Sequence, residues 1–99
     1  MSLTNKQISK LRGLAQRLEA ILHLGKAGAT DAFLAGVEQE LNNHELIKIK
    51  FAAFKDTRKE LSAEIATKTN SELVQIVGHV AVFYRMQPDP AKRRVPLDS

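Results

Sequence analysis

The sequence predicts a single α/β domain with the element order α-β-α-β-α-β-β. Apolar residues recur at helical spacing in three segments, and runs of high β propensity lie between and after them. The last two of these runs are separated by Gly78-His79, a connection typical of a two-residue β-hairpin turn. At 99 residues the chain is long enough for one hydrophobic core and too short for two.

The first helix is predicted from about Asn5 to Arg17. Thr4 and Gln7 have the spacing of a capping box, in which each side chain satisfies a backbone amide at the helix start. A row of basic side chains follows one flank of this helix: Lys6, Lys10 and Arg17. The row is either a cationic surface for a ligand or an ordinary solvated helix face.

A β-α-β unit follows. The apolar run from Ala20 to Leu24 predicts a strand buried on both faces or in the sheet centre. Thr30 is suited to cap the next helix, which Asn42-Asn43-His44 ends. The second strand alternates apolar and polar residues from Ile47 to Phe51, so one of its faces is buried. Its polar face carries Lys48 and Lys50. Strands joined in this way are parallel, with a right-handed crossover.

The rest of the domain predicts a third helix and the hairpin. The helix begins at Asp56 or Thr57 and ends at about Thr69. The hairpin joins residues 73–77 to residues 80–85.

A change in composition divides the chain after Met86. All three prolines follow this residue, and no apolar periodicity accompanies them. We therefore assign residues 1–86 to the domain and residues 87–99 to an extended basic tail outside the core. The run Lys92-Arg93-Arg94 either contacts phosphates or serves only to keep the tail soluble.

Composition and spacing exclude several kinds of site. The chain has no cysteine, so disulfides, thiolate metal sites, iron–sulfur clusters and a cysteine nucleophile are excluded. His23, His44 and His79 lack the spacings of metal ligands, and no serine lies in a nucleophile-elbow context. We therefore expect no metal, no cofactor, no small-molecule substrate and no enzymatic activity. The first residues lack the apolar run of a signal peptide, so we expect a cytoplasmic protein without a membrane partner.

The segment from Leu24 to Thr30 is the candidate binding site. Gly25 and Gly28 enclose Lys26 and Ala27 between the end of a strand and the start of a helix. Glycines allow positive φ and leave no Cβ between the main chain and a ligand. Free amides there and at the helix N-terminus favour anions, to which Lys26 adds a full positive charge. The alternative is that the glycines only form a tight connection.

The basic features together indicate a polyanionic partner. Fifteen Lys and Arg against 11 Asp and Glu give a net charge of +4 and a pI near 9.6. The glycine loop, the basic row on the first helix, the lysine pair on the second strand and the basic tail are each weak signals, but together they are typical of a protein that contacts phosphates. RNA is favoured over duplex DNA, because no helix-turn-helix, zinc finger or basic zipper is present and Gly-x-x-Gly loops clamp single-stranded RNA.

Three groups of residues occur in the same order in a known family. They are Leu24-Gly25-Lys26-Ala27-Gly28 with Thr30, then His44-Glu45-Leu46-Ile47-Lys48-Ile49-Lys50, then Val77-Gly78 with Val82-Phe83-Tyr84-Arg85. In this order and at these separations they resemble the CRM domain, named for chloroplast RNA splicing and ribosome maturation. The resemblance extends to about Arg85. The chain is similar to the stand-alone bacterial form of this domain, the YhbY-like proteins.

This resemblance implies a fold similar to the carboxyl-terminal domain of bacterial translation initiation factor three. It also implies RNA binding through the Gly-x-x-Gly loop and association with precursors of the large ribosomal subunit. Bacterial relatives often have Asn before the second glycine, where this chain has Ala27. If that Asn contacts RNA in the relatives, backbone amides and Lys26 must carry recognition here.

We therefore expect a two-layer α/β sandwich with a mixed four-stranded sheet. Its expected partner is large-subunit ribosomal RNA or the precursor particle, bound by a monomer. The expected RNA-binding residues are Gly25, Lys26, Ala27, Gly28, Lys6, Lys10, Arg17, Lys48 and Lys50. A second hypothesis is a protein-interaction adaptor on the ribosome that uses the exposed sheet face or the hairpin edge. A hydrolase with a dispersed site ranks below both.

Overall fold

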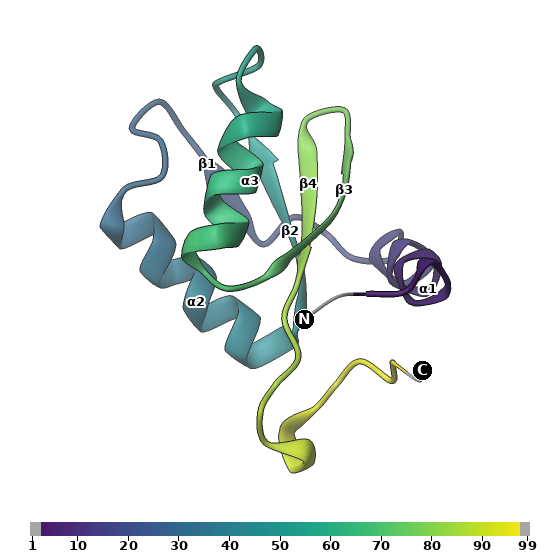
Figure 1. Cartoon of the computed structure of the whole chain (residues 1–99). Helices are drawn as coiled ribbons and strands as arrows, with labels where there is room; N and C mark the ends of the chain where they lie inside the picture. Colours follow the sequence, from purple (N-terminus) through teal and green to yellow (C-terminus); the bar gives the residue numbers. More distant parts are fainter. Residues whose placement is uncertain (1–2, 98–99) are drawn as a thin grey trace.

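The computed structural model describes residues 3–97 and shows three helices and four strands (Figure 1). In chain order these are α1 (Asn5–Ala15), β1 (Leu22–Leu24), α2 (Asp31–His44), β2 (Leu46–Phe51), α3 (Arg58–Lys68), β3 (Glu72–Val77) and β4 (Val80–Tyr84), followed by a short 3-10 helix, η1 (Pro90–Lys92). The sheet has the order β1-β2-β4-β3, with β1 parallel to β2 and the other neighbours antiparallel. The predicted α/β class, element order and mixed sheet are confirmed.

Helices cover both faces of the sheet. Ile47 and Ile49 of β2 join the larger core cluster, which α2 and α3 cover. Leu46 points to the alternate face and packs with Leu11 and Ala15 of α1. Figure 1 shows α2 and α3 on one side of the sheet and α1 on the other. The predicted two-layer sandwich therefore gains a partial third layer, because the apolar stripe of α1 also needs to be buried.

The first strand differs from its prediction. β1 is an edge strand of three residues, in which Leu24 is buried and His23 is exposed. Ile21, which was expected inside the strand, is 43% exposed. The prediction of a strand buried on both faces is wrong, because α1 packs on β2 and β3 and leaves that face of β1 open.

The helix starts follow their capping signals more closely than the helix ends do. Thr4 and Gln7 form the predicted capping box, and the Thr30 hydroxyl accepts a hydrogen bond from the amide of Phe33 at 3.1 Å. α1 ends at Ala15, two residues before its predicted end at Arg17. α2 continues through the Asn-Asn-His run to residue 44 instead of ending there, and stops where Glu45 adopts a φ of +66°.

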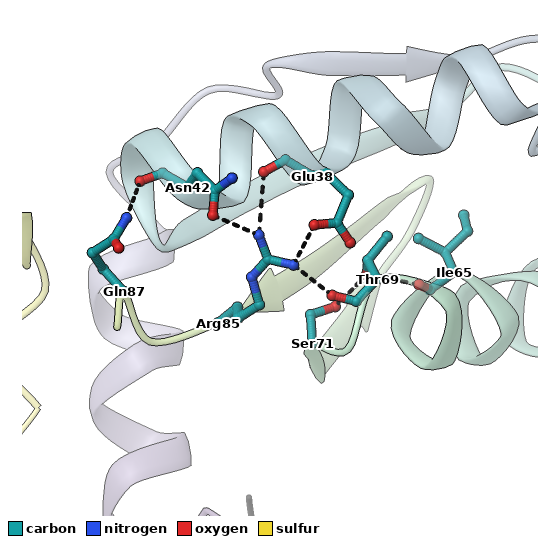
Figure 2. A network of polar contacts seen from close by, with 7 residues as sticks. All are labelled: Glu38, Asn42, Ile65, Thr69, Ser71, Arg85 and Gln87. Carbon is teal, nitrogen blue, oxygen red and sulfur yellow. Dashed lines mark hydrogen bonds and ion pairs between the residues drawn. The ribbon is translucent and has the colours of Figure 1, made fainter. Parts of the chain in front are cut away.

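A polar network fastens the ends of α2, α3 and β4 at one end of the sheet (Figure 2). Arg85, directly after β4, is half-buried and donates through Nη1 to Glu38 Oε2 at 2.6 Å and to the Thr69 carbonyl oxygen at 2.7 Å. Its Nη2 donates to Asn42 Oδ1 at 2.8 Å. Since the carboxylate of Glu38 compensates its charge, Arg85 is a structural residue.

The described part of the tail packs back on the domain. The buried carboxylate of Glu45 accepts hydrogen bonds from the amides of Gln87 at 2.8 Å, Arg94 at 2.6 Å and Val95 at 2.8 Å. Val95 and Leu97 pack against the core cluster beneath α1. The expectation of a tail outside the core is therefore wrong as far as Leu97, because Glu45 binds the tail amides. The domain boundary at residue 86 stays a prediction.

Among residues 3–97, no helix combines the length and the apolar character needed to cross a membrane.

Candidate nucleic-acid interface

The glycine loop connects the carboxyl end of β1 to the start of α2 and forms a tight turn. The Gly28 amide donates to the Gly25 carbonyl oxygen at 3.0 Å, and the Thr30 amide donates to the Gly28 carbonyl oxygen at 2.9 Å. Gly28 has a φ of +76°, the left-handed conformation that favours glycine. Positive φ in this loop was predicted, and the structure assigns it to the second glycine.

Two amides at the centre of the turn are available as donors. The amides of Lys26 and Ala27 have no hydrogen-bond partner among residues 3–97, and both side chains are exposed. The amides of Gly28 and Thr30 donate hydrogen bonds within the turn, and the amide of Phe33 donates to the hydroxyl of the helix cap. The centre of the donor surface is therefore formed by these two amides and the ammonium group of Lys26.

An aromatic side chain supports the loop from the connection between β2 and α3. A Cβ added to Gly28 would lie 3.4 Å from Cζ of Phe54, so the ring packs against the glycine. The two connections are also joined at their base, where the Ala52 amide donates to the Leu24 carbonyl oxygen at 2.9 Å. Phe54 has a φ of +63° and is 38% exposed. Sequence reasoning missed this contact, because no short-range pattern links the two loops.

The lysines of β2 lie on the sheet face that α1 only partly covers. Lys50 is exposed and lies beside His23 of β1 in the parallel register. Lys48 is half-buried, and its Nζ donates to the Leu18 carbonyl oxygen at 2.9 Å. The alternation that predicted a shared face for the two lysines is confirmed, but Lys50 alone has no hydrogen-bond or ion-pair partner among residues 3–97.

The structure separates the expected site residues into distinct regions. Lys26 and Lys50 lie at or near the carboxyl ends of adjacent parallel strands. Lys6 and Lys10 are exposed on α1, on the other side of the sheet from α2 and α3. Arg17 lines a hollow beside Leu46, at the opposite end of β2 from the loop. The binding roles of these residues stay predictions, and a single ligand contact does not unite all of them.

Three further basic side chains lie near the loop and were not predicted as site residues. Lys55 belongs to the connection between β2 and α3, Arg58 begins α3, and His79 lies in the β3–β4 turn. The available signal was topological: connections that follow adjacent parallel strands emerge at the same edge of a sheet. In the part of the chain that the structure describes, no group of three His, Cys, Asp or Glu side chains is arranged to hold a metal ion.

Comparison with known proteins shows the family. A family model described as the CRS1 / YhbY (CRM) domain matches residues 3–85. A Haemophilus influenzae protein named RNA-binding protein is 40% identical over 96 residues, which cover 96% of this chain and 96% of that protein. A Pseudomonas aeruginosa protein named as a probable RNA-binding protein is 39% identical over 93 residues, which cover 93% of this chain and 89% of that protein.

A solved structure shows the same fold. The solution structure of a hypothetical protein from Staphylococcus aureus has a TM-score of 0.78 and 35% identity, and the match covers 96% of this chain and 100% of that chain. The elements described above, including the Gly-x-x-Gly loop, fall within the matched residues as far as Arg85. This chain therefore belongs to the CRS1 / YhbY (CRM) domain family.

Proposed function

We propose that this chain is a cytoplasmic RNA-binding module that associates, as a monomer, with ribosomal RNA of the large subunit or with its precursor particle. Two relatives that are named as RNA-binding proteins support RNA as the partner. In this proposal the chain contributes binding and orientation, and it carries out no covalent step.

The observation that carries the proposal is the exposed turn of the glycine loop. The amides of Lys26 and Ala27 have no hydrogen-bond partner within the described residues, and the Lys26 side chain extends from the same turn. Two amide donors and an ammonium group complement the oxygens of a phosphate group. Since Ala27 has no polar side chain, the main chain itself makes these contacts.

The other expected residues contribute in different ways. Lys50 lies near the same sheet edge as the loop, and in the proposal it contacts the RNA directly. Lys6, Lys10 and Arg17 lie on other parts of the surface, so they act through long-range attraction, which raises the association rate and is screened by salt.

Salt-dependent titration of a fluorescently labelled oligouridylate tests the loop. Lys26→Ala should weaken binding and lower the slope of log affinity against log salt by about 0.7, the value for one single-strand phosphate contact. Gly25→Ala places a methyl group where no atom lies within 4 Å, so the fold is kept while close approach to the turn is hindered. We expect weaker binding from this variant as well.

Lys68→Ala is the control, because it removes one exposed lysine at the far end of α3, whose ammonium group is paired with Glu64 at 3.5 Å. We expect its salt slope to equal that of the unchanged protein. If Lys26→Ala, Gly25→Ala and Lys68→Ala all bind alike, the loop does not take part in binding.

Crosslinking in cell extract tests the identity of the RNA. Ultraviolet crosslinking followed by sequencing should concentrate the crosslinked nucleotides in large-subunit ribosomal RNA or its precursor. Crosslinks spread across messenger and transfer RNA in proportion to their abundance would refute the ribosomal assignment while leaving RNA binding intact.

A second candidate function is a protein adaptor, favoured by the open edge of the hairpin. β3 is an edge strand, and its Val77 is 62% exposed. Such an edge is able to pair with a strand of another protein. A partner that stays bound after ribonuclease treatment and is lost on Val77→Lys would support the adaptor, whereas complete release by ribonuclease would exclude it.

A further inference from the structure

A cationic hollow lies at the carboxyl end of β2, the strand next to the one that leads into the glycine loop. It has a volume of about 390 Å³, and its uncharged lining residues besides His79 are Phe51, Ala52 and Ala53. Its cationic lining residues are Lys50, Lys55 and Arg58, and the imidazole of His79 lies beside them. We propose that this hollow binds a backbone phosphate of the same RNA strand that contacts the glycine loop, an inference that rests on the proposed function.

The guanidinium group of Arg58 is held in place by the β3–β4 turn. Its Nη1 donates to the Gly78 carbonyl oxygen, and its Nη2 donates to Nδ1 of His79 at 3.0 Å. The turn is itself fixed to β2, because the Phe51 amide donates to the His79 carbonyl oxygen at 2.7 Å. The positive charge therefore has a fixed position before any ligand arrives, and little side-chain entropy is lost on binding.

The cations of this hollow form no ion pair with a described residue, although Asp56 lies in the same connection as Lys55. Within residues 3–97, no carboxylate lies within 4.0 Å of the charged atoms of Lys50, Lys55 or Arg58. The half-buried Arg85 at the other end of the sheet shows the contrast, since it is paired with Glu38 at 2.6 Å. A fixed guanidinium without a carboxylate leaves a strong local preference for an anion.

The surface that Phe54 forms with the glycine loop has a different character. There a hollow of about 470 Å³ is lined by Gly28, Glu60 and Glu64, together with uncharged residues. Glu64 is paired with Lys68 at 3.5 Å, and the carboxylate of Glu60 repels a phosphate backbone, whereas the hollow that contains Lys55 attracts it. The charge distribution therefore directs a strand leaving the glycine loop across Lys55 and not along α3.

Contact between the two loops makes one continuous path. The Ala52 amide donates a hydrogen bond to the Leu24 carbonyl oxygen at 2.9 Å. Ala52 lines the hollow, so the hollow adjoins the start of the glycine loop. Lys26 and Lys55 are then two cationic positions at the end of the sheet where β1 and β2 terminate. An RNA strand that spans both positions would gain two phosphate contacts and a correspondingly steeper salt dependence.

Lys55→Ala tests the hollow without disturbing the fold, because Lys55 is exposed and has no hydrogen-bond partner within the described residues. With labelled oligouridylate as the probe, we expect the salt slope to fall by about 0.7 in Lys55→Ala and by about twice that in the double variant with Lys26→Ala. Lys68→Ala should leave the slope unchanged. Circular dichroism should confirm that all the variants are folded.

The outcomes separate the inference from the proposed function. If Lys26→Ala lowers the slope while Lys55→Ala behaves like Lys68→Ala, the hollow is refuted and RNA binding by the loop stands. If Lys55→Ala lowers the slope and Lys26→Ala does not, the hollow binds RNA without the loop, which refutes both the role of the loop and the path that joins the two. If the unchanged protein does not bind the RNA, both are refuted.

Discussion

The two glycines of the loop differ in backbone conformation, so alanine should affect protein stability in opposite directions at the two positions. Gly28 has a φ of +76°, where a residue with a Cβ costs about 1–2 kcal/mol. The new Cβ would also lie 3.4 Å from the Phe54 ring, which is 38% exposed and free to shift. The backbone term therefore dominates, and we expect Gly28→Ala to lower the free energy of unfolding by about 1–2 kcal/mol.

Gly25→Ala has neither penalty. Gly25 is not among the residues with positive φ, and no atom lies within 4 Å of a Cβ built on it. Alanine at such a position reduces the conformational entropy of the unfolded chain, which stabilises the fold by about 0.4–1 kcal/mol. The two variants should thus differ by about 1.4–3 kcal/mol, the sum of the two ranges.

Urea denaturation followed by circular dichroism measures this difference. At about 4–8 °C for each kcal/mol in a domain of this size, Gly28→Ala should also lower the melting temperature by roughly 4–16 °C. The dependence of the free energy on urea should keep its slope, because the surface exposed on unfolding is unchanged. Equal midpoints for the two variants would refute the assignment of the strained position to Gly28.

Two further variants test other parts of the fold. Gly36→Ala in α2 should raise the free energy of unfolding by about 0.5–1 kcal/mol, because glycine destabilises a helix relative to alanine. The new Cβ would lie 3.9 Å from Leu22 Cδ2, which is an ordinary contact. A lower urea midpoint would show that the helix is already tightly packed there. Burial and, secondly, the charge of Glu45 raise the pKa of Tyr84 above 10.0, an effect that Arg93 partly offsets, so the folded state holds the proton more strongly than the unfolded state. Stability from this group is therefore complete below pH 10.0 and is lost as the pH rises above it, and Tyr84→Phe should remove that alkaline loss in urea midpoints measured across this range; a loss of the same size in the variant would assign it to other groups.

Local signals in the sequence predicted the parts of the fold that depend on neighbouring residues. The capping box of Thr4 and the cap at Thr30 depend on contacts three residues apart, so they could be predicted from spacing. The alternation from Ile47 to Phe51 predicted the two faces of β2, because successive side chains of a strand point to opposite faces. The helix ends were less predictable, because α2 ends where Glu45 adopts positive φ, and Glu45 is held there by contacts with the distant tail.

Long-range contacts account for what the sequence did not predict. The open face of β1 depends on where α1 packs, and no pattern within residues 20–24 records this. The tail is ordered by one buried carboxylate, that of Glu45, about 50 positions earlier in the chain. In the candidate site, the glycine loop was predicted. Phe54 and Arg58 were missed, because their positions relative to the loop depend on the pairing of β1 with β2.

The two ends of the sheet use similar residues for different purposes. At the end where β2 begins, Arg85 is half-buried and Glu45 is buried, and each is bound by chain segments distant in sequence. Figure 2 shows the contacts of Arg85. At the other end, Arg58 is also fixed by the chain, yet it lacks a carboxylate partner within the described residues. A purely structural role for Arg58 would be served better by a compensated charge, as it is at Arg85. In our proposal an RNA phosphate supplies the compensating anion, so Arg58 marks the end of the sheet that faces the RNA.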